Sequence, residues 1–406
     1  MQKTPFLLLS LLLLAGLTAA VGAGAEPTIT PEADLRVRQE IFDGVLYFAP
    51  DPDRNQVRFR TRVGLSLQDS LDTFKLLLAN EHRRYLHPED VEFDWDEVII
   101  DQLYWDHQGG SARWTLGRQN IIWDDGFLML EGKPLDGSRS IFHDALRLRT
   151  RAAGGRVDAA VIYNLKRDPM VLVGDEDRPL RDADEMGLAA RLEQGPLVTS
   201  YIFKREDDPD EVLPDRTTHT FSSRREGGHS QGLWWMYEVA GQYGRWSRAG
   251  GNSGSGWSLA LQARMEFPFG DTSRSEVGYF SYGNEFRTPW GRWPLWSELY
   301  IYTLIGESTP GRVHVAAWED IAAPFLGLRR DFSPAVKGKA RLYWLQTAGW
   351  DPRGLLLQTR LDFKLGSHAS GHLLWEMLDP GNFHDALSEA ELGTQHFLRW
   401  EIILKI

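Results

Sequence analysis

The sequence predicts an all-β fold, a transmembrane antiparallel β-barrel of about 18 strands with short periplasmic turns and longer extracellular loops. Three observations predict it. Polar and apolar residues alternate with a period of two through much of the chain, short and long connections alternate between these segments, and the last segment is amphipathic. A soluble sandwich with an aromatic core is the alternative, and a secretion signal at the N-terminus favours the barrel.

The first 25 residues have the features of a cleaved signal peptide. Lys3 gives a basic start, an apolar run extends from Phe6 to Leu17, and Ala23-Gly24-Ala25 matches the A-x-A cleavage pattern. We therefore expect residues 1–25 to be removed and residues 26–406 to form one outer-membrane barrel domain. After residue 25 no apolar run is long enough for a transmembrane helix.

The clearest strand pattern contains Arg58, Arg60 and Arg62, which alternate with Val57, Phe59, Thr61 and Val63. Because side chains in a strand point alternately to opposite faces, this segment has one charged face and one face that is mostly apolar. In a membrane barrel the charged face points inward and the apolar face contacts lipid. The same alternation occurs in residues 257–267, 355–365 and 398–406.

Turn-forming residues divide the chain into short and long connections. Short turns are expected at residues 68–70, 107–110, 152–155, 193–195, 226–228, 269–273, 306–311, 333–338 and 366–370. Longer connections are expected at residues 43–55, 87–95, 119–138, 168–184, 206–216, 246–255, 285–296 and 379–392. Aromatic residues near the strand ends predict belts at the membrane interface. They include Trp234, Trp235, Tyr237, Trp290, Trp293, Trp296, Tyr300, Tyr302, Tyr343 and Trp344.

The composition excludes several classes of protein. A net charge of −12 argues against nucleic acid as a partner. The chain has no cysteine, so it has no disulfide, thiolate metal site or cysteine nucleophile. Of its 45 basic residues only nine are lysines. The remaining arginines carry a planar guanidinium that suits carboxylate and phosphate groups.

Residues 116–139 contain Leu-Gly-Arg-Gln, Asp-Asp-Gly-Phe and Gly-Lys-Pro-Leu-Asp-Gly-Ser-Arg, and resemble the alginate export family of outer-membrane channels. Further matching segments are residues 78–83, 293–300, 370–376 and 397–401. The resemblance implies a monomeric barrel with an arginine-rich interior, through which an anionic polyuronate leaves the periplasm. It also implies outer-membrane lipid, lipopolysaccharide and periplasmic secretion machinery as partners, and no cofactor.

If the apolar stripes contact lipid, the opposite faces place a set of arginines in the lumen, where rings of basic residues favour anions. The predicted pore-lining residues are Arg36, Arg38, Arg58, Arg60, Arg62, Arg113, Arg147, Arg149, Arg264, Arg360 and Arg399. The alternative is that these arginines pair with acids on neighbouring strands and serve only the barrel. The set Arg58, Arg60 and Arg62 has no acid within its own strand segment.

Two loop features leave alternatives open. The connection at residues 119–139 either folds inward as a constriction or lies on the outer surface. The acidic runs 175–177 and 206–211 are expected outside the cell, where they either share divalent cations with lipopolysaccharide or form solvated charged surfaces. The solvated surface is the interpretation that the spacing favours, because it matches no known metal loop and predicts no metal site.

Three functions are compatible with this pattern. The leading hypothesis is passive export of an anionic polysaccharide, and the alternative is a general porin for small anions or sugars. A barrel hydrolase would need a nucleophile and base at one rim. The candidates His82, His143-Asp144 and His384-Asp385 have no G-x-S-x-G or H-E-x-x-H motif around them. We therefore expect a channel in the bacterial outer membrane rather than an enzyme.

Overall fold

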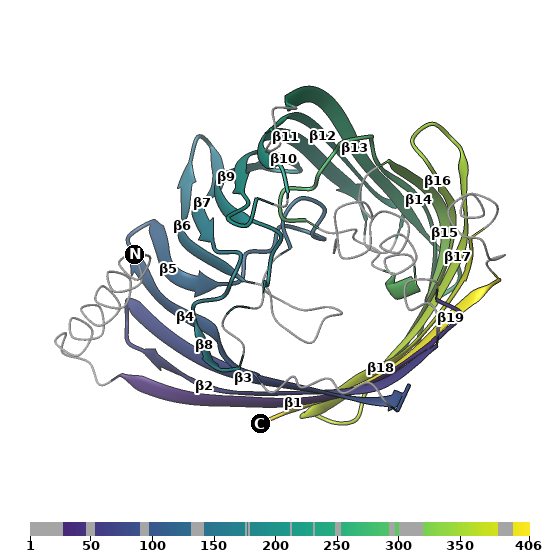
Figure 1. The fold of residues 1–406 in the computed structure, drawn as a ribbon, viewed down its shortest axis with the longest axis horizontal. Coiled ribbons are helices and arrows are strands. Elements are labelled where there is room, and N and C mark those ends of the chain that lie inside the picture. Colours follow the sequence, from purple (N-terminus) through teal and green to yellow (C-terminus); the bar gives the residue numbers. More distant parts are fainter. Residues whose placement is uncertain are drawn as a thin grey trace.

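The structure is a computed structural model, and it describes residues 27–45, 53–89, 97–130, 142–174, 177, 179–211, 213–229, 232–247, 253–291, 297–299, 320–380 and 393–406. The predicted signal peptide lies outside these residues. Within them the strands form one closed antiparallel barrel of 18 strands, in which β19 pairs with β1 (Figure 1). A further short strand, β8, pairs only with β4. No described helix is long and apolar enough to cross a membrane.

The strand bounds are as follows. They are β1 (Thr28–Asp43), β2 (Arg54–Gln68), β3 (Asp72–His87), β4 (Glu97–Gly109), β5 (Ala112–Gln119), β6 (His143–Ala152), β7 (Gly155–Asn164), β8 (Val171–Val173), β9 (Asp184–Gln194), β10 (Leu197–Asp207), β11 (Asp215–Gly228), β12 (Trp234–Ser247), β13 (Ser253–Pro268), β14 (Ser273–Tyr282), β15 (Ile321–Ser333), β16 (Val336–Gln346), β17 (Pro352–Lys364), β18 (Ala369–Asp379) and β19 (Gln395–Lys405).

The two faces of the sheet differ as the period-two pattern predicts. On β1 the inward side chains of Arg36, Arg38 and Glu40 are buried, whereas the outward Leu35 is 37% exposed. On β13 the outward Trp257 and Leu259 are 74% and 66% exposed. A charged inner face and an exposed apolar outer face are the arrangement that a lipid bilayer requires of a barrel.

The connections alternate between short and long, and most predicted positions are confirmed. The turn between β2 and β3 shows why such turns form: the Asp69 carboxylate accepts hydrogen bonds from the backbone N–H groups of Leu71 and Asp72, both at 2.8 Å. The predicted turn at 306–311 lies outside the described residues, and no boundary was predicted between β16 and β17. That connection, residues 347–351, is short although it lies at the long-loop end, because Thr347 and Asp351 hydrogen-bond each other's backbone and side chains.

The aromatic belt prediction is wrong at three positions and confirmed at others. One of the three is Trp234, which faces inward with its ring 4.9 Å from the guanidinium carbon of Arg264. Tyr237 and Trp344 are exposed on the outer face. Trp290 and Tyr343 are instead buried inside the barrel, at 2% and 0% exposure. Trp290 precedes β15 in a connection that turns inward, so its position in the sequence near a strand end did not place it at the lipid interface. Trp293, Trp296, Tyr300 and Tyr302 lie outside the described residues.

Candidate functional site

The interior wall formed by β1, β2, β3 and β19 is the part of the barrel richest in arginine. Antiparallel register places Arg38 opposite Arg58, and Arg58 opposite Arg83 on β3. Arg36 lies opposite Arg60 in the next row, two residues further along the strands. Arginines therefore outnumber carboxylates here: Arg36, Arg38, Arg58, Arg60, Arg62, Arg83 and Arg399 lie among Asp34, Glu40, Glu81 and Glu401. We call this surface the arginine wall.

Carboxylates from neighbouring strands pair with the arginines predicted on β1 and β2. Arg58 lies 2.9 Å from Glu40, Arg38 lies 2.5 Å from Glu401, and Arg36 lies 3.9 Å from Glu401. On the next rows Arg62 lies 2.6 Å from Asp34 and 3.4 Å from Asp101, and Arg60 lies 3.5 Å from Asp34. The absence of an acid within the segment of Arg58, Arg60 and Arg62 therefore did not mean that these residues lack ion pairs. Their acids come from β1 and β4.

The other predicted arginines also face inward and also have acidic partners. These pairs are Arg113 with Asp106 (2.5 Å), Arg149 with Asp106 (3.1 Å), Arg147 with Asp158 (2.5 Å), Arg264 with Glu266 (3.5 Å), Arg360 with Asp362 (2.7 Å) and Arg399 with Glu298 (2.7 Å). Burying a charge is costly unless it is paired, so this arrangement lets the barrel carry a charged interior. The structure places all the predicted residues on the inner face. Their role in binding a solute stays a prediction.

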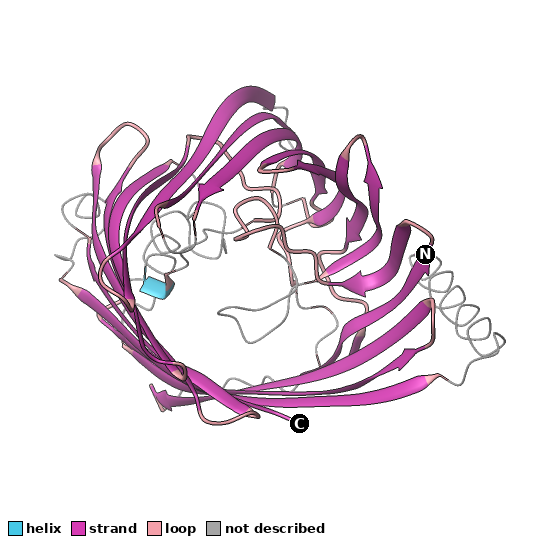
Figure 2. Ribbon diagram, turned by 180° about the vertical axis from the view of Figure 1, so that it is seen from behind, coloured by secondary structure: helices cyan, strands magenta, loops and turns pink. Residues whose placement is uncertain are grey.

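The described part of the connection between β5 and β6 folds into the barrel. Residues 120–130, which we call the inward loop, bury Ile121, Phe127 and Met129. Figure 2 shows connecting segments inside the ring of strands. The loop hydrogen-bonds the segment that follows β14, because Leu130 N–H donates to the Trp290 carbonyl at 2.9 Å and Trp290 N–H donates to the Leu128 carbonyl at 3.1 Å. The inward alternative is therefore confirmed for residues 120–130, while residues 131–138 lie outside the description.

Opposite charges anchor the inward loop to the wall formed by β7, β9, β11 and β13. Asp124 lies 2.8 Å from Arg191, and Asp125 lies 3.6 Å from Arg224 and accepts a hydrogen bond from Gln262 at 3.1 Å. Trp123 donates to Asp158 at 3.2 Å. The acids of the loop thus pair with arginines on this side of the barrel. Among the described residues, no side chain of the loop forms an ion pair with the arginine wall.

Arg191 and Arg224 were not among the arginines predicted to line the pore, although the alternating pattern of their strands predicts an inward position for them. Arg191 alternates with the outward Leu188, Ala190 and Leu192 in the same way that Arg58 alternates with its neighbours. Residues 297–299 complete the described interior, since Ser297 and the Leu299 N–H donate to Glu376 at 2.9 and 3.1 Å.

A cluster of ion pairs lies on the outer face of the barrel near the end of β5, where the chain turns into the inward loop. β5 ends at Gln119, so the end of β4 has no β5 partner, and β8 pairs instead with Val98 and Ile99. Arg118 is completely buried there, 3.0 Å from Asp144 and 2.9 Å from Asp168, and its guanidinium carbon lies 3.4 Å from the centre of the Phe142 ring. Asp168 belongs to the segment that leads into β8, so this cluster attaches that segment to the barrel.

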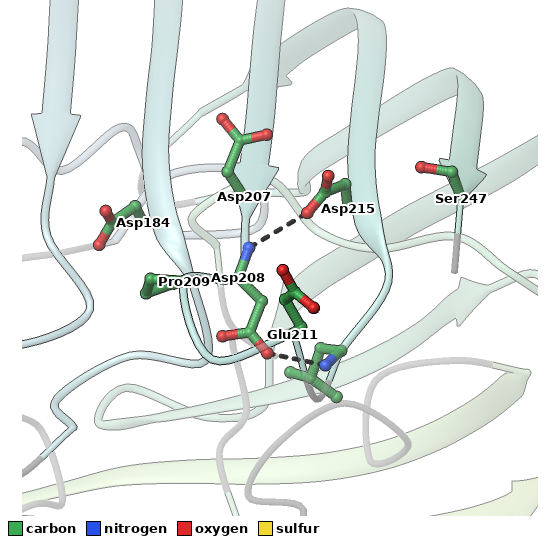
Figure 3. Close-up of a pocket in the computed structure, with 8 residues that line it drawn as sticks. Asp184, Asp207, Asp208, Pro209, Glu211, Asp215 and Ser247 are labelled. Atoms are coloured by element: carbon green, nitrogen blue, oxygen red, sulfur yellow. Dashed lines mark hydrogen bonds between the residues drawn. The ribbon is translucent and has the colours of Figure 1, made fainter. Parts of the chain in front are cut away.

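The acidic run at residues 206–211 is ion-paired at the long-loop end of the barrel, which corrects the interpretation of a merely solvated surface. Lys166 lies 2.5 Å from Asp208 and 2.9 Å from Asp210, and Arg167 also contacts Asp210. Figure 3 shows the Asp208 side chain accepting from the backbone N–H of Leu213, beside Asp184, Asp207 and Asp215. No group of residues able to hold a metal ion occurs among those described. In the other run, Asp175 and Glu176 lie outside them.

The two described histidines that were considered as catalytic candidates contact aromatic and amide side chains. His143 is completely buried, with its ring edge-on to Trp290 at 5.5 Å and 3.3 Å from the Asn164 amide. His82 is exposed on the outer face beside Phe59. His384 and Asp385 lie outside the described residues.

Solved structures of outer-membrane channels have the same fold. OccK8 (OprE) of Pseudomonas aeruginosa superposes with a TM-score of 0.61 at 9% identity, over 93% of this chain and 98% of that chain. OccAB1 of Acinetobacter baumannii gives 0.59 at 9% identity, over 93% and 96%. The fold is that of an outer-membrane channel. OpdK of P. aeruginosa gives 0.59 at 10% identity, over 93% and 99%.

No model of a known family matches the sequence, and no curated protein matches it. The resemblance to the alginate export family therefore has support only in its coarser part, the outer-membrane channel barrel. The apolar outer face and this fold together place the barrel in a bacterial outer membrane.

Proposed function

We propose that the barrel is a porin-type diffusion channel for small anionic solutes, with carboxylates as the favoured class. The support is the arginine wall, whose rows follow one another along β1 and β2 at two-residue steps of about 6.8 Å. A carboxylate passing along this wall meets successive guanidinium groups, and weak binding at several sites permits conduction. One channel of the same fold, OpdK, is described with vanillate, which is a small carboxylate.

Arg60 is the observation that carries the proposal. The residue is 4% exposed, its ion-pair partner Asp34 is 3.5 Å away, and its Nε and Nη1 atoms have no hydrogen-bond partner among the described residues. Buried donors without acceptors are unfavourable, so a carboxylate solute would complete the coordination of Arg60. The tightly paired Arg38 and Arg62 are structural by comparison.

Export of a polyuronate uses the same charge preference but needs room for a polymer. The inward loop occupies part of the interior, and its anchors hold it on the wall opposite to the arginine wall. This arrangement favours small solutes over a polysaccharide.

The test is electrical recording of the purified protein in planar lipid bilayers under a salt gradient. We expect a reversal potential that shows anion selectivity, and a reduction of the anion-to-cation permeability ratio by about twofold or more in Arg60→Gln. The matched control is Arg225→Gln on β11, because Arg225 pairs with Leu197 and Tyr237 on the outer face and cannot contact the lumen.

Cation selectivity of the wild-type pore would overturn the proposal. Equal permeability ratios in wild type and Arg60→Gln would show that Arg60 does not contribute to the selectivity. A pore that is blocked by polyuronate but excludes small carboxylates would favour polymer export instead.

A further inference from the structure

The outer surface of β10–β13 carries three chemically distinct rows at the long-loop end of the barrel. The first, the aromatic row, consists of the register partners Phe203, His219, Tyr243 and Trp257. The second, the arginine row, consists of Arg205, Thr217, Arg245 and Ser255. Beyond it lie Asp207 on β10 and Asp215 on β11, the acidic row.

Strand geometry fixes the spacing of these rows. Successive rows are two residues apart along each strand, or about 6.8 Å, and neighbouring strands are about 4.8 Å apart. Arg205 and Arg245 both pair with Thr217, so their backbones are separated by two strand spacings, about 10 Å. Two guanidinium groups therefore flank a threonine hydroxyl on the outside of the barrel.

The aromatic row marks the depth of the membrane interface. Trp257 is 74% exposed and its ring lies 5.2 Å from that of Tyr243, while Phe203 and His219 are also 5.2 Å apart. Rings of this kind concentrate at the boundary between acyl chains and headgroups. The arginine row is the next layer toward the outside, which is the level of the lipid phosphates.

The arginine row has a groove and available donors. A groove of about 640 Å³ is lined by Arg205, Thr217, Tyr243, Arg245 and Ser255 together with residues of the acidic row, and it extends to Arg216 and Trp246 at the strand ends. The side chains of Arg205 and Asp207 are 52% and 47% exposed. Arg205 uses Nε to contact Asp207 at 2.9 Å, and Arg245 uses Nε to contact the Tyr243 hydroxyl at 3.1 Å. The terminal nitrogens of both guanidinium groups make no hydrogen bond to any described residue.

We propose that this surface binds lipopolysaccharide, with a phosphate of its lipid headgroup held between Arg205 and Arg245. The acyl chains would lie against the aromatic row, and the acidic row would repel the phosphate from any position further out. Arginine binds phosphate with paired, charge-assisted hydrogen bonds. The order apolar, basic, acidic therefore sets the depth of a phosphorylated lipid, whereas an acidic cluster alone would not attract one.

The experiment measures binding of phosphorylated deep-rough lipopolysaccharide to the purified, folded full-length protein in detergent by native mass spectrometry and titration. The Arg205→Ala/Arg245→Ala variant should bind about a hundredfold more weakly, since it loses two charge-assisted contacts and each is worth about one order of magnitude. Arg225→Ala is the matched control, because Arg225 is an outward arginine near the short-turn end of the same sheet.

Enzymatically dephosphorylated lipopolysaccharide should bind the wild type as weakly as the intact lipid binds the double variant. Equal affinity of wild type and double variant, or indifference to the phosphate, would overturn the proposal. So would equal competition by phosphatidylglycerol, which would indicate an unspecific anionic site. The heat-dependent gel mobility of each variant verifies that it is folded. Conductance does not enter this test, so its result is independent of the proposed solute preference.

Discussion

Individual charged residues in this barrel are mostly satisfied by partners that are close in space and far apart in sequence. Arg38 and Glu401 are separated by 363 residues along the chain and by 2.5 Å in space. Such pairing makes an arginine-rich interior compatible with folding, because removing one partner of a buried pair typically costs about 3–5 kcal/mol. We therefore expect the proposed selectivity to depend on the few arginines whose pairing is loose, of which Arg60 is the clearest among the described residues.

At the residue scale, the acid stability of one extracellular loop is expected to depend on Asp208. Burial would raise its pKa, but hydrogen bonds from Lys166 and from the backbone of Leu213 and Asp210 outweigh burial and lower the pKa to about 2. A folded pKa below the ordinary value means that ionised Asp208 stabilises the loop above pH ~4, and that this stability is lost as the pH falls from about 4 to about 2.

Pepsin cleavage at residues 208–214, followed by mass spectrometry, measures this effect. We expect cleavage of the wild type to accelerate over that pH interval, relative to pepsin activity on an unstructured peptide. In Asp208→Asn the loop should be cleaved readily throughout. Asp331→Asn, an exposed acid near the end of β15 at the opposite end of the barrel, is the control. An unchanged pH profile in Asp208→Asn would show that another group controls the loop.

At the scale of the element, the inward loop is held by ion pairs to arginines of the barrel wall. These arginines also pair with glutamates of the wall itself. Arg191 retains Glu193 at 2.9 Å, and Arg224 retains Glu226 and Glu238, when Asp124 and Asp125 are removed. The barrel wall therefore does not depend on the loop for charge balance. This makes the loop a separate element that can be released without leaving buried charges unpaired.

We expect Asp124→Ala/Asp125→Ala to raise single-channel conductance by about twofold or more, because the loop loses its anchors and conduction depends on the free cross-section of the pore. Bilayer recording measures the change, and Arg225→Ala, on the outer face of β11, should conduct as the wild type does. A conductance equal to that of the wild type would mean that the apolar contacts of Phe127 and Met129 hold the loop in place without the two acids.

At the scale of the whole molecule, the closed sheet orders its outer face by depth. The pair Val239 and Leu261 lies midway between the aromatic pair Tyr243 and Trp257 at one end and the pair of Trp235 with Met265 at the other. This position is therefore expected at the middle of the membrane. Ser247, paired with Ser253 at the long-loop end, lies outside it.

Val239→Arg should destabilise the barrel by about 2–4 kcal/mol, and Ser247→Arg by about 0–1 kcal/mol, because the cost of a charge on the lipid face depends on depth. Urea unfolding of the protein in lipid vesicles measures both. Equal costs at the two positions would contradict the depth that the outer rows imply.

The sequence predicted the strands and their faces because period-two alternation is local. The inward position of Arg58, Arg60 and Arg62 follows from their immediate neighbours alone. The partners of these residues could not be predicted, since Glu40, Asp34 and Asp101 meet them only through the register of β1, β2 and β4. Trp290 was misplaced for a related reason: an aromatic residue near a strand end is compatible with the lipid interface or with the interior, and only the direction of its connection distinguishes them.

The sequence by itself determined a barrel with alternating short and long connections and a charged inner face, because each of these depends on residues adjacent along the chain. Tertiary structure decided that residues 120–130 turn inward, that β8 completes the wall where β5 ends, and that opposite charges offset most of the inner arginines. These features depend on contacts between segments up to several hundred residues apart, and closure of the sheet is what brings those segments together.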